Sequence, residues 1–180
     1  MTVGGRVDSS HNSIRGEEHI RIIRGRYVRT WLLVCEMAQS KEVFLSYGHE
    51  PEVDKFVTRL KSDLEKEGIS VWRDKDNIPP GSNWPNMIGV GVYDCRALLC
   101  ILTNKYVSSS DNCKRELDYA LAQRKMVFPV LYETVDWKKN ENAKGVSFVL
   151  GNIQRADFRP DKVDYQEALK NLVTAMKERG

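Results

Sequence analysis

Short apolar runs alternate with longer amphipathic stretches along the chain, and this alternation predicts a repeating strand-then-helix order. Apolar runs predict five strands, at residues 43–46, 69–72, 97–102, 126–131 and 153–158. The third run is apolar without interruption, which is typical of a strand buried on both faces. Crossovers of this kind are right-handed and give a parallel sheet. The pattern therefore predicts an α/β, flavodoxin-like three-layer fold, with a central, mainly parallel five-stranded sheet flanked by helices.

Helices are predicted where apolar residues recur every three or four positions. One begins at Pro51, where proline is tolerated, and ends at Gly68 as a C-terminal cap. Its predicted inner face consists of Val53, Phe56, Val57, Leu60 and Leu64. Another is capped by Asp111 or Asn112, and its predicted inner face consists of Cys113, Leu117, Ala120 and Leu121. The last carries the stripe Tyr165, Ala168, Leu169, Leu172 and Met176.

The pattern is less regular between these elements. Ser82 is the predicted cap of a further helix, which is weakened by Gly89 and Gly91. Residues 73–81 are predicted to form a charged loop, residues 103–111 a Ser-rich loop and residues 133–151 an irregular segment. Pro129 lies inside the fourth apolar run and indicates a strand end or an edge strand.

The N-terminal part of the chain differs in composition from the rest. Residues 1–16 are rich in Gly, Ser, Arg and Asn, which predicts a disordered tail. Residues 17–40 form a predicted N-terminal extension, where Ile20, Ile23, Tyr27, Trp31 and Val34 have helical spacing. That helix is expected to dock either on the domain or on a partner. The domain itself is predicted to span residues 41–180.

Composition narrows the function classes. The 180 residues suit one α/β domain with an appendage, and a net charge of +3 is too small to indicate nucleic-acid binding. No segment approaches the roughly 20 apolar residues of a membrane span, and the N-terminus has no secretory signal pattern. The four cysteines lack metal-ligand spacing, so Cys95 and Cys100 are interpreted as small core residues. We therefore expect reduced thiols and a cytoplasmic protein.

Three predicted strands run into polar segments, and the corresponding sequences are FLSYGHE (44–50), RDKDNIPPGSNW (73–84) and SSSDNCKREL (108–117). In a parallel sheet their loops emerge at one edge, where ligands bind. In order and spacing they resemble three motifs of TIR domains, the Toll/interleukin-1 receptor/resistance-protein family. These are the first conserved box, the BB loop and the segment with the catalytic glutamate. The resemblance covers residues 41–177, and IPPGSNW with SYGHE is closer to the NAD-cleaving bacterial-type branch than to Toll-like receptors.

The resemblance implies two classes of function. Some TIR domains are NAD glycohydrolases, which cleave the nicotinamide-ribose bond to give nicotinamide and ADP-ribose or a cyclic variant, in immune or cell-death signalling. NAD is then a substrate, and no cofactor or metal is expected. The alternative is a non-catalytic adaptor that signals by homotypic TIR assembly. In either class the BB loop is the expected surface for self-association, here Asp76, Ile78, Pro79, Pro80 and Gly81.

Glu116 is the predicted catalytic residue. Nicotinamide leaves NAD as a neutral molecule, so no general acid is required. A single carboxylate suffices to stabilise the oxocarbenium-like charge and to hold the ribose hydroxyls. The structural alternative is a first-turn glutamate that interacts favourably with the helix dipole. For Trp84, stacking on the substrate and packing of its helix into the core are both expected alternatives.

The remaining predicted substrate-binding residues are Ser46, Tyr47, Gly48 and His49 after the first strand, and Cys113 in the third motif. Gly48 would allow close backbone approach or a positive φ. An animal NAD-cleaving TIR domain has phosphate-contacting arginines at the positions of Gly48 and His49. Many active members have Trp where this chain has Asn112.

Charged residues in the second and third motifs have simpler interpretations. Asp74 and Asp76 are expected to cap turns and to pair with Arg73 and Lys75, not to bind a metal. Lys114 and Arg115 are expected to be solvated.

Overall fold

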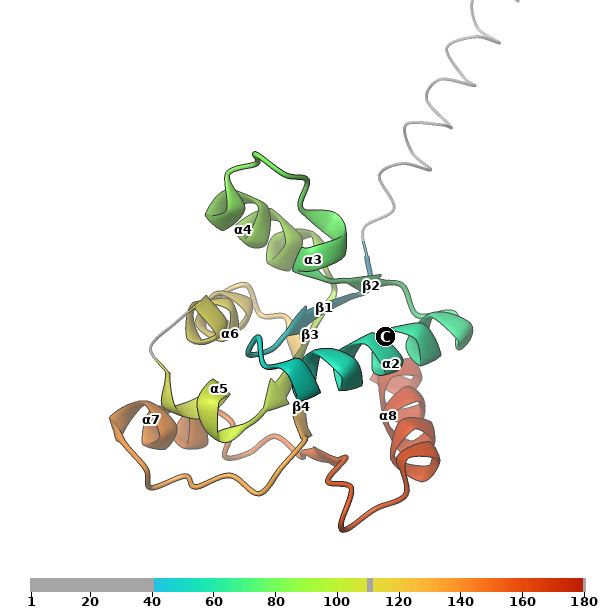
Figure 1. Ribbon diagram of the computed structural model, residues 1–180, viewed down its shortest axis with the longest axis vertical. Coiled ribbons are helices and arrows are strands. Elements are labelled where there is room, and N and C mark those ends of the chain that lie inside the picture. Colours follow the sequence, from blue (N-terminus) through green and yellow to red (C-terminus); the bar gives the residue numbers. More distant parts are fainter. Residues whose placement is uncertain (1–40, 110–111, 180) are drawn as a thin grey trace, which may run out of the picture. The chain divides into compact units, whose positions relative to one another are not determined.

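A parallel five-stranded sheet lies at the centre of the domain in this computed structural model, which describes residues 41–109 and 112–179 (Figure 1). The strands are β1 (Val43–Ser46), β2 (Val71–Trp72), β3 (Ala97–Leu102), β4 (Met126–Leu131) and β5 (Ala156–Asp157). Their order is β2-β1-β3-β4-β5, and each neighbouring pair is parallel. The predicted tail and N-terminal extension lie outside the described residues.

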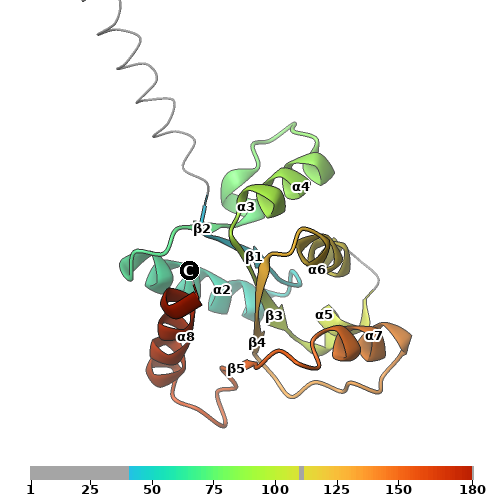
Figure 2. The same cartoon turned by 180° about the vertical axis from the view of Figure 1, so that it is seen from behind.

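Helices cover both faces of the sheet, as two opposite views show (Figures 1 and 2). Helices α2 (Pro51–Lys66) and α8 (Tyr165–Arg179) pack on one face, whereas α4 (Trp84–Asp94) and α6 (Asn112–Ala122) pack on the other. Side chains of β3 alternate between the two cores, with Ala97, Leu99 and Ile101 in one and Leu98, Cys100 and Leu102 in the other. The predicted three-layer α/β fold is confirmed.

The sequence explains where helix α2 begins and where it ends. Pro51 is its first residue, where the missing backbone N–H breaks no helical hydrogen bond. Gly68, just beyond the end, has a φ of +84°, a left-handed conformation that a residue with a side chain reaches only with strain. Between them Val53, Val57, Leu60 and Leu64 are buried, and Phe56 is partly buried against the same core. The predicted inner face of this helix is confirmed.

Gly91 in α4 has a packing reason that the sequence pattern does not reveal. A Cβ atom at Gly91 would lie 2.6 Å from the Trp72 indole, closer than any real contact. The absent side chain lets α4 approach Trp72, which in turn stacks on Phe44 with ring centroids 4.6 Å apart. The glycine that weakens the helix thus permits the contact that attaches it to the sheet.

Three helices occupy segments for which the sequence pattern predicts none: α3 (Asp74–Asn77), α5 (Asn104–Ser108) and α7 (Glu141–Val149). Side-chain caps account for two of them. The Thr103 hydroxyl accepts a hydrogen bond from the backbone N–H of Tyr106, and the Asn140 side chain accepts one from Ala143. Helix α4 is likewise capped by Asn83, so the prediction of Ser82 as its cap is wrong by one residue.

The edge strands are shorter than predicted. Pairing in β2 begins at Val71, and the N–H of the preceding Ile69 bonds to the Leu64 carbonyl at the end of α2. Strand β5 is confined to residues 156–157 of the predicted 153–158. Strand β4 is internal, so the edge interpretation of Pro129 is wrong for the strand as a whole. Its pairing to β5 is confined to Val130 and Leu131, however, so Pro129 precedes it.

Buried thiols belong to the core. Cys95 and Cys100 are 1% and 0% exposed, and burial raises the pKa of each thiol to about 12, which keeps them protonated and inert. The interpretation of both as core residues is confirmed. Within residues 41–109 and 112–179, no helix is long and apolar enough to cross a membrane.

Candidate active site

A cleft of about 420 Å³ opens at the carboxyl edge of the sheet, where the turn after β1 faces the start of α6. Six residues predicted to bind or cleave a substrate line it: Tyr47, Gly48, His49, Trp84, Cys113 and Glu116. Among the described residues, five more without a predicted site role also line it: Lys105, Tyr106, Ser109, Asn112 and Arg115. Sheet topology therefore brings together segments that lie up to about 70 positions apart in the sequence.

Glu116 is a buried carboxylate, with only 7% of its surface exposed. It is the fifth residue of α6, and the first turn of that helix contains no acidic residue among those described. Ser46 at the end of β1 donates a hydrogen bond to Glu116 Oε2 over 2.6 Å. Ser46 itself is completely buried, so it contacts the carboxylate from behind instead of lining the cleft. Because Glu116 lies beyond the first turn of α6, the interpretation of it as a first-turn glutamate that interacts with the helix dipole does not fit.

Burial controls the ionisation of this carboxylate. It raises the pKa of Glu116 to about 7, because the charged form loses its hydration. The Ser46 hydrogen bond opposes this increase, and the negative charge of Asp74 adds to it. Near neutral pH, Glu116 is therefore present in both protonation states.

A buried tyrosine supports the Ser46–Glu116 pair. The Tyr106 hydroxyl lies 3.0 Å from Ser46 Oγ and also donates to the Cys113 carbonyl over 3.4 Å. Burial raises the pKa of Tyr106 well above its ordinary value, so the hydroxyl keeps its proton. Tyr106 thereby joins the end of β1 to the beginning of α6, where the carboxylate is located. In the sequence Tyr106 stands in the polar segment TNKYVSSS, where only the adjacent Val107 indicates burial.

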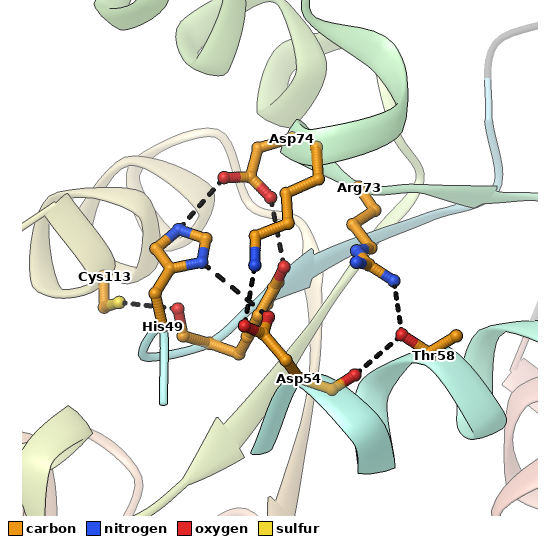
Figure 3. Close-up of polar contacts among 8 residues, drawn as sticks. His49, Asp54, Thr58, Arg73, Asp74 and Cys113 are labelled. Carbon is orange, nitrogen blue, oxygen red and sulfur yellow. Dashed lines mark hydrogen bonds and ion pairs between the residues drawn. The ribbon is translucent and has the colours of Figure 1, made fainter. Parts of the chain in front are cut away.

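A second polar cluster joins the turn after β1 to α3 (Figure 3). His49 Nε2 lies 3.0 Å from Asp74 Oδ2, and the Tyr47 hydroxyl donates to Asp74 Oδ1 over 3.3 Å. Burial, together with the Asp74 charge, raises the pKa of Tyr47 well above its ordinary value. The Cys113 thiol on α6 donates to the Tyr47 carbonyl over 3.3 Å, which connects the same turn to α6. Asp74 therefore fixes two residues that line the cleft.

Charged residues around α3 have partners other than those predicted. Lys75 Nζ lies 2.6 Å from Asp54 Oδ2 on α2, and Asp76 lies 3.6 Å from Lys61. Asp74 pairs with His49 instead of Arg73 or Lys75, so the predicted pairing within the loop is wrong. The side chains of α3 reach α2 and the turn after β1, so each of these charges lies beside a residue that is distant in the sequence. In the described part of the chain, no three His, Cys, Asp or Glu side chains converge as a metal site would require.

Comparison with known proteins identifies the family. The family model for the TIR domain matches residues 43–173. The chain belongs to the TIR domain family. No curated protein sequence matches it significantly.

Solved structures with the same fold come from proteins of different kinds. The TIR domains of the activated Roq1 resistosome are 20% identical with a TM-score of 0.59, and the match covers 74% of this chain and 98% of that one. The TIR domain of the Toll-related receptor TRR-2 from Hydra magnipapillata is 19% identical with a TM-score of 0.61, covering 76% and 98%. The CMP N-glycosidase BcmB from Clostridium botulinum is 19% identical with a TM-score of 0.51, covering 74% and 98%. At such identities these structures show the fold alone.

The segment that resembles the BB loop of TIR domains contains a tight turn that is open to solvent. The Ser82 N–H donates to the Pro79 carbonyl over 3.2 Å, and Gly81 has a φ of +81°. A proline followed by a left-handed glycine is the sequence of a type II turn. Pro79, Pro80 and Gly81 are exposed, whereas Ile78 is partly buried against the core. The predicted assembly residues of the loop lie outside the lining of the cleft.

Trp84 and Gly48 complete the TIR cleft. Trp84 is the first residue of α4, lines the cleft and packs against the core, so its position is compatible with both predicted roles. Gly48 does not have a positive φ, so that alternative is wrong. A Cβ atom there would lie 3.7 Å from Glu50 Oε2, an ordinary contact.

Proposed function

We propose that this TIR domain is an NAD glycohydrolase in which Glu116 is the catalytic residue. The observation that supports this most directly is a buried carboxylate in the same cleft as the Trp84 indole. In the proposed reaction the bond between ribose C1′ and the nicotinamide nitrogen breaks, and its electron pair leaves with nicotinamide. Water adds to C1′ and loses a proton, which gives ADP-ribose. This hydrolysis transfers no net electrons, so NAD acts as a substrate and not as a redox cofactor.

Glu116 would act in its ionised form. A carboxylate close to C1′ stabilises the positive charge that develops as nicotinamide leaves. Burial strengthens this effect, since the electrostatic interaction operates in a medium of low dielectric constant. The substrate's pyridinium ring is itself a cation, so its binding would favour ionisation of the carboxylate.

The rest of the cleft would orient the substrate. An indole such as Trp84 can stack on nicotinamide or adenine, a contact that contributes about 1–3 kcal/mol in comparable base–aromatic pairs. Tyr47, Gly48, His49 and Cys113 line the cleft and would form its walls around the ribose. One protein of the same fold, BcmB, is described as a CMP N-glycosidase, so this fold supports cleavage of an N-glycosidic bond in at least one case.

Nicotinamide release is the direct test. Purified protein incubated with NAD is expected to release nicotinamide, and Glu116→Gln should reduce the rate by about 10²–10³-fold, as for loss of a major electrostatic group. The control is Glu65→Gln, which changes an exposed glutamate on α2 that pairs with Lys61. Equal release by wild type and Glu116→Gln would contradict the catalytic assignment. Mass spectrometry of the product separates ADP-ribose from a cyclic variant.

Self-association through the BB loop belongs to the same proposal, in immune or cell-death signalling in the cytoplasm. Its support is the exposed turn at residues 79–81, together with solved TIR domains described as a resistosome and as the RPS4 and RRS1 heterodimer. The specific activity is expected to rise with protein concentration. A constant specific activity, in protein that light scattering shows to be monomeric, would contradict assembly.

A non-catalytic TIR adaptor is the second candidate, favoured by the same exposed turn. It predicts assembly without nicotinamide release at any concentration. The two functions are therefore separated by measuring light scattering and nicotinamide release on the same samples.

A further inference from the structure

Two cationic side chains line the same cleft as Glu116 but come from different segments. Lys105 belongs to α5, after β3, and Arg115 belongs to α6. Both are exposed, and among the described residues neither has a carboxylate partner. Other cations nearby are already paired, since Lys114 contacts Asp118 over 2.9 Å. Lys105 and Arg115 therefore carry positive charge that the described part of the domain does not neutralise.

The turn after β1 provides no comparable free cation. His49 is held by Asp74 at 3.0 Å, and Gly48 has no side chain. The stem of Lys105 extends across this turn, because a Cβ atom placed on Gly48 would lie 3.9 Å from Lys105 Cδ. The ammonium group of Lys105 therefore serves the β1 side of the cleft, although Lys105 belongs to the segment after β3.

Charge changes sign with depth in the cleft. Glu116 is 7% exposed and lies against completely buried Ser46, whereas Lys105 and Arg115 are exposed at its rim. A molecule with a cationic glycosidic centre at one end and a phosphate beyond its ribose would match this order. A free nucleoside would satisfy only the inner part of the cleft.

We propose that Lys105 and Arg115 form a phosphate subsite, which selects nucleotides with a 5′-phosphate or diphosphate over free nucleosides. The inference rests on the proposed glycohydrolase function, and it specifies the substrate class. Arginine can bind two phosphate oxygens at once through its planar guanidinium, whereas lysine contributes a single mobile charge.

Substrates of graded charge test the subsite. NAD, nicotinamide mononucleotide and nicotinamide riboside contain the same glycosidic bond but carry a diphosphate, one phosphate and none. Relative to wild type, the double variant Lys105→Gln/Arg115→Gln should lose about tenfold to a hundredfold in kcat/KM for NAD, chiefly through KM. The loss should decrease from NAD to the mononucleotide and be smallest for the riboside. Lys114→Gln is the matched control, because Lys114 is on the same helix but does not line the cleft.

Equal losses for all three substrates, or no loss for NAD, would overturn the proposal. A binding experiment keeps it testable if the protein releases no nicotinamide. Calorimetric titration of wild type with ADP-ribose should show binding that weakens with added salt, and the double variant should bind at least tenfold more weakly. That result would support the subsite while the glycohydrolase function fails. Absent or salt-independent binding to wild type, or equal binding to the two proteins, would refute the subsite.

Discussion

The interior of the sheet and its carboxyl edge are built from different chemistry. All six residues of β3 are apolar and at most 5% exposed. At the carboxyl edge, by contrast, polar side chains are buried. Ser46 ends β1, Arg73 and Asp74 follow β2, Thr103 follows β3, and Glu116 faces the end of β1 from α6. Within the described residues these five are the buried polar or charged ones.

This difference separates what stabilises the domain from what is available for chemistry. Apolar burial contributes about 25 cal/mol per Å² and is the dominant favourable term in folding, so the interior chiefly stabilises the domain. A buried carboxylate lowers stability when it is charged, because hydration is lost and one hydrogen bond restores only part of it. A buried carboxylate such as Glu116 is therefore better explained by a functional role than by a contribution to stability.

The largest expected effect on stability comes from the interior. Leu60→Ala removes a completely buried side chain from α2 and should lower the free energy of unfolding by about 2–5 kcal/mol. Nicotinamide release per folded molecule should be unchanged, since Leu60 lies in the core and does not line the cleft. Chemical denaturation of Leu60→Ala and of Ser62→Ala, on the exposed side of the same helix, measures the difference. Similar midpoints for the two variants would contradict the contrast between the regions.

At the edge, the sign of the effect should reverse. The folded protein holds the Glu116 proton more tightly than the unfolded chain, because its pKa is raised from 4.5 to about 7. Wild-type stability is therefore expected to fall as the pH rises through this window, by up to about 3 kcal/mol. Glu116→Gln removes the titration, so it should match wild type at pH 4 and exceed it at pH 8.

Denaturation curves at the two pH values check this prediction. The Glu65→Gln variant provides the comparison, since Glu65 is exposed. If Glu116→Gln were less stable than wild type at pH 8, the carboxylate would be serving a structural purpose, and the distinction between interior and edge would not hold.

Sequence periodicity predicts the interior better than the edge. The strand β3 and the stripe on α2 follow from residue spacing alone, because burial on one or both faces imposes a period. Helices α5 and α7 are short, and their caps Thr103 and Asn140 are evident only once the backbone is known. The packing of Gly91 on Trp72 is equally hidden, since it depends on how closely two elements approach.

At the edge, motif order identifies most of the lining of the cleft but not its connections. Glu116, Trp84 and Tyr47 were predicted and do line the cleft. The contacts of Tyr106 with Ser46 and of Asp74 with His49 join residues 60 and 25 positions apart, and no local pattern encodes them. From the sequence, Arg115 is expected to be solvated. A charged side chain at the rim of a cleft and one on an open surface have the same local sequence pattern, so the sequence does not distinguish them.

The smallest expected effect tests how the edge controls the carboxylate. The Ser46 hydrogen bond lowers the pKa of Glu116, so Ser46→Ala should raise it further and shift the ascending limb of the pH–activity profile upward by roughly one pH unit. Activity should fall most below pH 7 and recover at higher pH, because the carboxylate must be ionised to act. Ser46→Thr keeps a hydroxyl and should move the profile less. A uniform loss at all pH values, with no shift, would mean that Ser46 only supports the structure around Glu116.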